Sequence, residues 1–202
     1  MTEKARIAVL VSGGGTNLQA LLDAQQTGIL HSGQIVLVVS NNSKAYALER
    51  AAKYAVATAV CKGPTFEADL RVLLKEYRID LIILAGFMRI LSEDFTSEWP
   101  NRILNVHPSL IPAFCGKGYY GLRVHEEALR RGVKVTGATV HFVNEIPDGG
   151  EIILQKAVEV LPGDTPETLQ RRVMEQAEWI LLPQAAELVS KGVKAGPIFW
   201  TS

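Results

Sequence analysis

Two polar side chains, two residues apart, could act together on a carbonyl group. Asn105 and His107 belong to the segment Asn-Val-His-Pro, which follows a short apolar run. Residues i and i+2 of a β-strand point to the same side, so an amide donor and a titratable imidazole could face one cleft. Such a pair suits stabilisation of the oxyanion that forms when a nucleophile attacks a carbonyl. On these residues alone, it is equally acceptable that His107 only anchors the proline-rich loop after it.

A third candidate, Asp148, occupies a Pro-Asp-Gly-Gly turn between two apolar stretches. Aspartate and glycine are favoured in turns, and most aspartates in this context serve only the turn. A carboxylate close to His107 would raise the pKa of the imidazole and could accept or relay a proton. The residue pattern by itself does not bring Asp148 and His107 together.

A glycine-rich segment separates an apolar run from a set of leucines at helical spacing. It consists of Gly13, Gly14, Gly15, Thr16 and Asn17. Unpaired amide groups and the positive end of a helix dipole at such a point can receive a phosphate. The segment has neither the lysine of a Walker loop nor the third glycine of G-x-G-x-x-G. We favour phosphate binding over a tight turn with a helix cap, because open α/β sheets bind ligands after the first strand.

Other reactive residue types do not form a recognisable site. His31, His125 and His141 fall in a turn, a helix and an alternating strand, without H-E-x-x-H or H-x-x-E-H spacing, so no metal site is expected. Cys61 and Cys115 are far apart and lack ligand spacing. Two free thiols in a reducing cytosol are therefore expected.

Composition limits the class of protein. The chain has 202 residues, of which 48% are hydrophobic, with 21 basic and 21 acidic side chains. This suffices for one sizeable core, so we expect a single domain over residues 1–202. Zero formal net charge provides no global field to attract nucleic acid or an anionic membrane. The apolar runs are far shorter than the ~20 residues of a membrane span, and no signal peptide is recognised, so a cytoplasmic location is expected.

Alternating patterns predict the elements that must position these residues. Strands are expected at residues 7–11, 35–40, 58–60, 81–84 and 102–106, separated by helices that include Ala45–Tyr54 and Phe66–Tyr77. This order favours a Rossmann-like α/β fold, a mostly parallel twisted sheet with helices on both faces. Residues 135–143 and 152–160 predict a C-terminal antiparallel extension. An irregular loop is expected from Pro108 to Gly121, then a helix near Arg123–Arg131, and a last helix from about Pro166 to Val189.

Four motifs occur in order along nearly the whole chain. They are Ser-Gly-Gly-Gly-Thr-Asn-Leu-Gln-Ala at 12–20, Leu-Ala-Gly-Phe-Met-Arg-Ile-Leu at 84–91, Asn-Val-His-Pro-Ser-Leu-Ile-Pro at 105–112, and Gly-Ala-Thr-Val-His-Phe-Val at 137–143 with Asp-Gly-Gly at 148–150. Together they resemble the motifs of the phosphoribosylglycinamide formyltransferases. The resemblance implies transfer of the formyl group of 10-formyltetrahydrofolate to the amino group of 5′-phosphoribosylglycinamide (GAR). The products would be formylglycinamide ribonucleotide and tetrahydrofolate in de novo purine biosynthesis, with no metal.

The resemblance also implies roles for residues. Asn105 would donate to the formyl oxygen, the His107 imidazolium would stabilise the oxyanion, and Asp148 would hold that charge and help to move the amine proton. The glycine-rich segment would bind the GAR phosphate, and Glu178, or alternatively Glu175, would contact the glycinamide end. Folate would be bound by Lys62, Met88, Arg89, Ile90, Leu91, Asn105, Val143, Asn144, Glu145, Ile146, Pro147 and Asp148. Residues 1–100 would form a phosphate-binding half, and residues 101–190 a folate and catalytic half.

The chain departs from the family pattern in three places. The loop Ala113–Leu122 is longer than the family's loop, and the helix between Val173 and Pro183 is one residue longer. Where many members have an arginine before the third helix, this chain has Lys62. Either Lys62 would take over the contact with the folate glutamate tail, or that contact would be absent.

Two kinds of alternative remain open. One is another 10-formyltetrahydrofolate-dependent enzyme, a formyltransferase acting on methionyl-tRNA or a nucleotide-linked sugar, or a formyl-folate hydrolase. The other is a non-catalytic nucleotide-binding module that uses only the glycine-rich segment. A short, neutral chain favours GAR over tRNA as the acceptor. Both a monomer and a homodimer fit the sequence.

Overall fold

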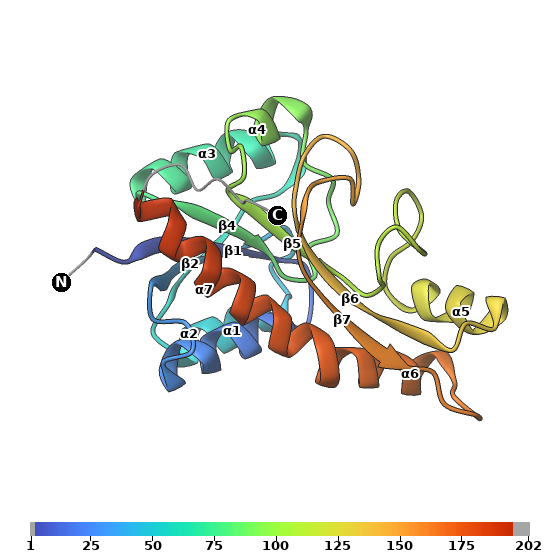
Figure 1. Ribbon diagram of the computed structural model, residues 1–202. Coiled ribbons are helices and arrows are strands. Elements are labelled where there is room, and N and C mark those ends of the chain that lie inside the picture. The colour runs from blue at the N-terminus through green and yellow to red at the C-terminus, as the bar shows by residue number, and fades with distance from the viewer. Residues whose placement is uncertain (1–2, 196–202) are drawn as a thin grey trace.

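One mixed sheet runs through the protein, for which a computed structural model describes residues 3–195. The seven strands have the order β3-β2-β1-β4-β5-β6-β7 (Figure 1). Their bounds are β1 (Ala5–Val11), β2 (Gly33–Ser40), β3 (Ala57–Val60), β4 (Leu81–Leu84), β5 (Ile103–His107), β6 (Val135–Phe142) and β7 (Ile152–Glu159). Strands β1 to β5 are parallel, whereas β6 is antiparallel to both β5 and β7. The predicted Rossmann-like sheet and its antiparallel extension are confirmed.

Helices cover both faces of the sheet. They are α1 (Thr16–Thr27), α2 (Tyr46–Lys53), α3 (Phe66–Glu76), α4 (Glu93–Ser97), α5 (Leu122–Arg131), α6 (Pro166–Val173) and α7 (Trp179–Ala195), with a π-helical turn at Met174–Glu178 and a 3₁₀ turn at Gly63–Thr65. In Figure 1, α1, α2 and α7 lie on one side of the sheet, and α3 and α4 lie on the other.

Strand β1, in the interior of the sheet, shows why the apolar runs are continuous rather than alternating. Ile7 and Val9 of β1 belong to the core under α1 and α7, whereas Ala8 and Leu10 belong to the core under α3. All four side chains are fully buried. A strand covered on both faces needs apolar residues at every position, which is the pattern of a parallel sheet in an α/β protein.

Two features were not predicted. Helix α4 spans only five residues and is preceded by the N-cap residue Ser92, whose hydroxyl accepts a hydrogen bond from the amide of Phe95. So short a helix shows no apolar periodicity. The C-terminal helix begins as predicted, with Thr165 in a capping box and Pro166 in the first turn, but the π-helical turn interrupts it before α7 continues to Ala195.

The fold brings three sequence motifs to one edge of the sheet. The glycine-rich segment follows β1, the segment beginning at Gly86 follows β4, and His107 ends β5. Strands β1 and β4 are neighbours in the sheet. After β1 the chain continues to β2 on one side of this pair, and after β4 it continues to β5 on the other side. Open α/β sheets bind ligands at such a switch point, beyond the carboxyl ends of the strands.

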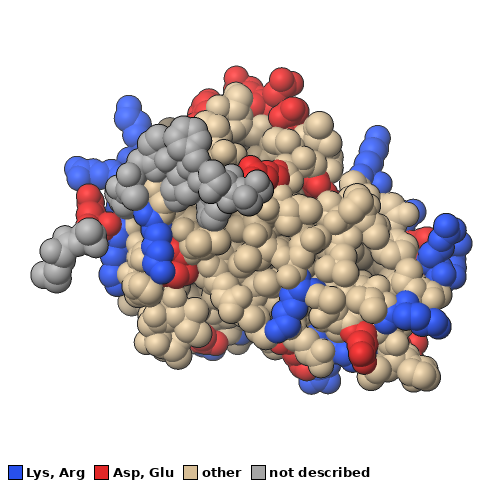
Figure 2. Space-filling view, in the orientation of Figure 1, with Lys and Arg blue, Asp and Glu red and all other residues tan. Residues whose placement is uncertain are grey.

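The surface carries charges of both signs. On the face in Figure 2, Lys and Arg lie singly or in small groups around the rim, with Asp and Glu among them, and most of the surface carries neither. Among residues 3–195, no helix combines the length and the apolar character that crossing a membrane requires.

Candidate active site

A cleft with a volume of about 650 Å³ opens at the carboxyl edge of the sheet. Its lining comes from the start of α1, the segments after β4 and β5, the loop before α5, the β6–β7 loop and the π-helical turn. All four motifs that stand out in the sequence therefore contribute to one concave site.

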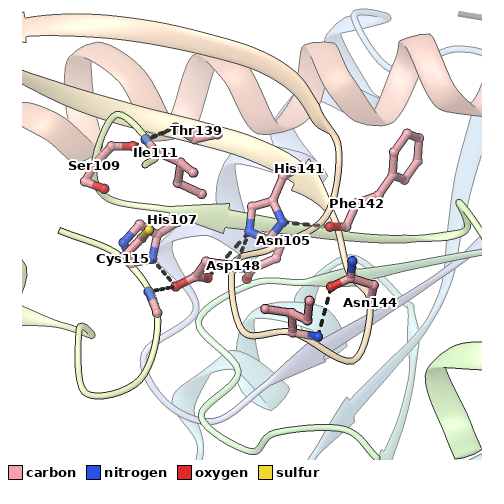
Figure 3. Close-up of polar contacts among 12 residues, drawn as sticks. Asn105, His107, Ser109, Ile111, Cys115, Thr139, His141, Phe142, Asn144 and Asp148 are labelled. Carbon is pink, nitrogen blue, oxygen red and sulfur yellow. Dashed lines mark hydrogen bonds and ion pairs between the residues drawn. The ribbon is translucent and has the colours of Figure 1, made fainter. Parts of the chain in front are cut away.

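Asn105 and His107 both line this cleft from β5, and Asp148 reaches it from the β6–β7 loop. Nδ1 of His107 lies 3.5 Å from Oδ2 of Asp148 (Figure 3). Asp148 has a φ of 57°, a left-handed conformation that aspartate tolerates better than most residues. The turn residue is thus also the residue that brings a carboxylate to the imidazole.

The backbone of the loop before α5 holds both of these side chains. Nε2 of His107 lies 2.8 Å from the carbonyl oxygen of Phe114, which can only accept, so Nε2 carries a proton. The amide of Gly116 donates to Oδ2 of Asp148 at 2.8 Å. Nδ1 of His107 therefore faces the carboxylate, and a protonated ring would have an acceptor at each nitrogen.

His141 is a member of this cluster that the sequence analysis did not select. Antiparallel pairing of β5 with β6 sets His141 directly opposite Asn105. The His141 Nδ1–H group donates to the carbonyl of Phe142 at 2.7 Å, so Nε2 of the neutral ring can accept from Asn105 Nδ2 at 3.2 Å. Nε2 also lies 3.6 Å from Oδ1 of Asp148. The position of His141 beside Asn105 follows from the pairing of β5 with β6, but predicting it requires knowledge of the register between these two strands.

Burial and neighbouring charges set the protonation of the cluster. Burial lowers the pKa of His107, although the Asp148 carboxylate opposes this effect. Burial alone would raise the pKa of Asp148, but contacts with His141, His107 and the Gly116 amide outweigh it and lower that pKa. Burial also lowers the pKa of His125 to about 4, and the charge of a protonated His107 acts in the same direction. His125 is therefore neutral at pH 7.

The glycine-rich segment presents unpaired amide groups. Within residues 3–195, no acceptor takes the N–H groups of residues 13–17. Gly15 is the N-cap residue of α1 and has a φ of 73°, which glycine adopts without strain. A row of free amides at a helix N-terminus is suited to a phosphate group.

The structure distinguishes between Glu178 and Glu175. Oε2 of Glu178 accepts from Asn17 Nδ2 at 2.7 Å, and only 6% of Glu178 is exposed. Glu175 points to the surface and pairs with Arg171. A π-helical turn accommodates one extra residue in a helix, which agrees with the extra residue noted between Val173 and Pro183.

Glu178 and Asn17 together provide acceptors for a ligand. Burial raises the pKa of Glu178 to about 7, although the hydrogen bond from Asn17 opposes the shift. Oδ1 of Asn17 is buried and has no hydrogen-bond partner among the described residues. A buried acceptor without a partner costs free energy unless a ligand donor satisfies it, and an amine or a sugar hydroxyl could do so.

The remaining predicted folate residues form two walls of the cleft. Residues 88–91 line one wall and residues 143–147 line the other. Met88, Ile90 and Ile146 are each more than half exposed, so apolar side chains are available to a ligand.

Lys62 does not line the cleft with the others. Its Nζ donates to the hydroxyl of Ser43 at 2.8 Å. Arg89 does line the cleft, with its guanidinium carbon 4.6 Å from the centroid of the Phe66 ring and Nη1 donating to the carbonyl of Gly63. Within residues 3–195, no three His, Cys, Asp or Glu side chains are grouped to hold a metal ion.

The chain resembles known formyltransferases in both sequence and structure. The family model described as "Formyl transferase" matches residues 5–185. The chain is 39% identical to the phosphoribosylglycinamide formyltransferase of Haemophilus influenzae, across 93% of this chain and 88% of that protein. The crystal structure of glycinamide ribonucleotide transformylase 1 from Symbiobacterium toebii superimposes with a TM-score of 0.86 at 44% identity, covering 93% of this chain and 88% of that one.

A longer relative contains a similar segment. The human trifunctional purine biosynthetic protein adenosine-3 is 44% identical over 98% of this chain, but the chain spans only 20% of that protein's length.

Proposed function

The chain belongs to the formyl transferase family, and on that premise we propose that it transfers a formyl group from 10-formyltetrahydrofolate to the amino group of GAR. The observation that carries the proposal is the composition of one cleft. Thr16, Asn17 and Glu178 line it together with the cluster of Asn105, His107 and Asp148. The free amides of residues 13–17 belong to the segment that ends at Asn17.

The glycine-rich segment, Asn17 and Glu178 point to GAR as the acceptor of the formyl group. The GAR phosphate would accept from the free amides of residues 13–17, with the α1 dipole adding to the attraction. Glu178 and the unpaired oxygen of Asn17 would accept from the glycinamide amine or the ribose hydroxyls. Residues 1–100 thus supply the phosphate site, and later residues supply the chemistry.

Formyl transfer requires an amine nitrogen to attack a carbonyl carbon. The GAR nitrogen would form a bond to the formyl carbon, the carbonyl oxygen would become an oxyanion, and the bond from N10 to that carbon would then break. The amine loses one proton and N10 of the departing tetrahydrofolate gains one, so the proton balance is closed.

Three side chains would serve these steps. Asn105 donates one amide hydrogen to His141, which leaves its second hydrogen for the formyl oxygen. The His107 imidazolium, held between Phe114 and Asp148, would stabilise the oxyanion through its positive charge. Asp148, with a lowered pKa, would remain ionised and would move the proton away from the amine.

Folate would occupy the space between the walls formed by residues 88–91 and 143–147. Its flat ring suits the exposed apolar side chains of Met88, Ile90 and Ile146, and its amide-like edge suits the backbone of both segments. For the glutamate tail we propose Arg89 in place of Lys62, because Arg89 lines the cleft.

The proposal is tested by following formyl-folate consumption spectroscopically with candidate acceptors. GAR should support turnover, whereas water, methionyl-tRNA and an amino-sugar nucleotide should not. Turnover with water alone would indicate a hydrolase. Binding of GAR without any formyl transfer would favour the non-catalytic nucleotide-binding module.

A further inference from the structure

Helix α2 holds the carbonyl groups of the glycine-rich segment. The amide of Ala47 donates to the carbonyl of Gly13 at 3.1 Å. Nε of Arg50 donates to the carbonyl of Gly14 at 2.8 Å. Both donors come from the first two turns of α2, which is not adjacent to this segment in the sequence.

These two hydrogen bonds determine where the neighbouring amides point. In a planar trans peptide, the C=O of one residue and the N–H of the next point in opposite directions. Because the Gly13 and Gly14 carbonyls face α2, the N–H groups of Gly14 and Gly15 face away from it. Those are two of the amides that no acceptor takes within residues 3–195.

Arg50 is itself held in place. Its Nη1 donates to Oε1 of Gln19 at 2.9 Å, and its guanidinium carbon lies 5.0 Å from the centroid of the Tyr46 ring. The close fit of the two segments also explains a glycine, since a Cβ at Gly15 would lie 2.6 Å from the Cβ of Ala47.

Arg50 lies on the outer side of the segment. It lines a separate groove of about 530 Å³ between α1 and α7, and it does not line the substrate cleft. Its guanidinium contacts a carbonyl of the segment, on the side opposite to the Gly15 amide.

We propose that Arg50 is a positioning residue for phosphate binding, which acts by fixing the Gly14–Gly15 peptide so that its amide faces the ligand. The inference rests on the proposed function for its substrate, GAR, and on the contacts above for its mechanism. Arg50 would contribute to binding through the backbone and would take no part in formyl transfer.

The test compares Arg50→Met and Arg50→Lys with Lys53→Met in steady-state assays. R50M should raise the KM for GAR about tenfold, while kcat and the KM for formyl-folate change less than about twofold, because only phosphate binding is affected. R50K should recover less than half of the loss, since a lysine ammonium lacks the fixed fork that reaches Gly14 and Gln19 together. K53M is the matched control, because it removes the same charge from the same helix, and it should behave like the wild type.

Three results would overturn the inference: an unchanged KM for GAR in R50M, full recovery in R50K, or an equal loss in K53M. The last two would show that positive charge alone attracts the phosphate. Melting curves test whether the variants fold. If R50M does not fold, Arg50→Gln replaces it, with the same predicted effect on the KM for GAR.

A second measurement separates this inference from the proposed function. Calorimetric titration with ribose 5-phosphate needs no turnover. Binding should weaken about tenfold in R50M and stay unchanged in K53M. If the wild type fails to formylate GAR, the proposed function fails, while this titration still decides whether Arg50 positions the segment. Equal binding by R50M and the wild type would refute the role of Arg50.

Discussion

Nδ1 of His107 lies 3.5 Å from Oδ2 of Asp148, so the end of β5 and the β6–β7 loop meet at one ion pair. The carbonyl of Phe114 holds the other nitrogen of the ring. Burial disfavours the imidazolium, whereas the carboxylate favours it. The balance between these two effects sets what fraction of His107 is charged at neutral pH.

Removing the carboxylate should lower the pKa of His107 further. The His107 pKa is already below its ordinary value because of burial, and Asp148 is the group that opposes this shift. In Asp148→Asn the imidazolium loses that support, so its titration should move to lower pH. NMR titration of the His107 ring measures the pKa directly, and an unchanged or higher value in the variant would contradict the assignment.

Replacing His107 should affect the chemical step and leave acceptor binding intact. In His107→Ala we expect kcat to fall by something like 10² or more, because oxyanion stabilisation is lost. GAR binding, measured by calorimetry, should stay normal because the phosphate amides are untouched. Unchanged turnover would rule out the catalytic role of His107.

A bell-shaped pH–rate profile is also expected, since the reaction needs a charged imidazole and an uncharged amine.

A substitution of Gly116 tests whether the loop backbone positions Asp148. Gly116 has a φ of 84°, and a Cβ there would meet no atom within 4 Å, so Gly116→Ala acts through backbone strain rather than collision. Strain of about 1 kcal/mol should displace the amide that donates to Asp148. We expect kcat to fall several-fold and the pKa of Asp148 to rise, because a donor to its ionised form is lost.

Gly132 offers the matched control for this experiment. It has a φ of 73°, caps the end of α5 and likewise has open space at its Cβ position. Gly132→Ala should cost similar stability and leave kcat unchanged. Equal losses of kcat in both variants would mean that general destabilisation, and not the position of Asp148, causes the effect.

Glu178→Gln should weaken GAR binding and stabilise the protein at alkaline pH. The folded-state pKa of Glu178 is raised by burial to about 7, so its favourable contribution is complete below about pH 4.5 and is lost as pH rises through 7. Glutamine removes the buried charge. At 1.36 kcal/mol per pKa unit, unfolding at pH 8 should require up to about 3 kcal/mol more than in the wild type, with little difference at pH 4.5.

Glu175→Gln is the control for that substitution. Glu175 is exposed and, within residues 3–195, forms an ion pair with Arg171 alone, so neither stability nor the KM for GAR should change appreciably. Denaturant unfolding at the two pH values and steady-state kinetics provide the measurements. If Glu175→Gln raised the KM for GAR and Glu178→Gln did not, Glu175 rather than Glu178 would be the residue that contacts GAR.

Much of the fold could be predicted because the patterns that encode it are local. The apolar run of β1, the glycine-rich segment and the start of α6 at Pro166 depend on neighbouring residues, and a single sequence displays them. Alternation along β5 likewise indicates that Asn105 and His107 share a face.

Only the tertiary structure decided which distant groups meet. The β5–β6 register places His141 opposite Asn105, and the fold brings Glu178, but not Glu175, into the cleft beside Asn17. Backbone groups of Phe114 and Gly116 hold His107 and Asp148 without any side-chain signal in the sequence. These contacts depend on how the sheet pairs and how loops close, and residue type alone does not specify which backbone amide or carbonyl will lie beside a given side chain.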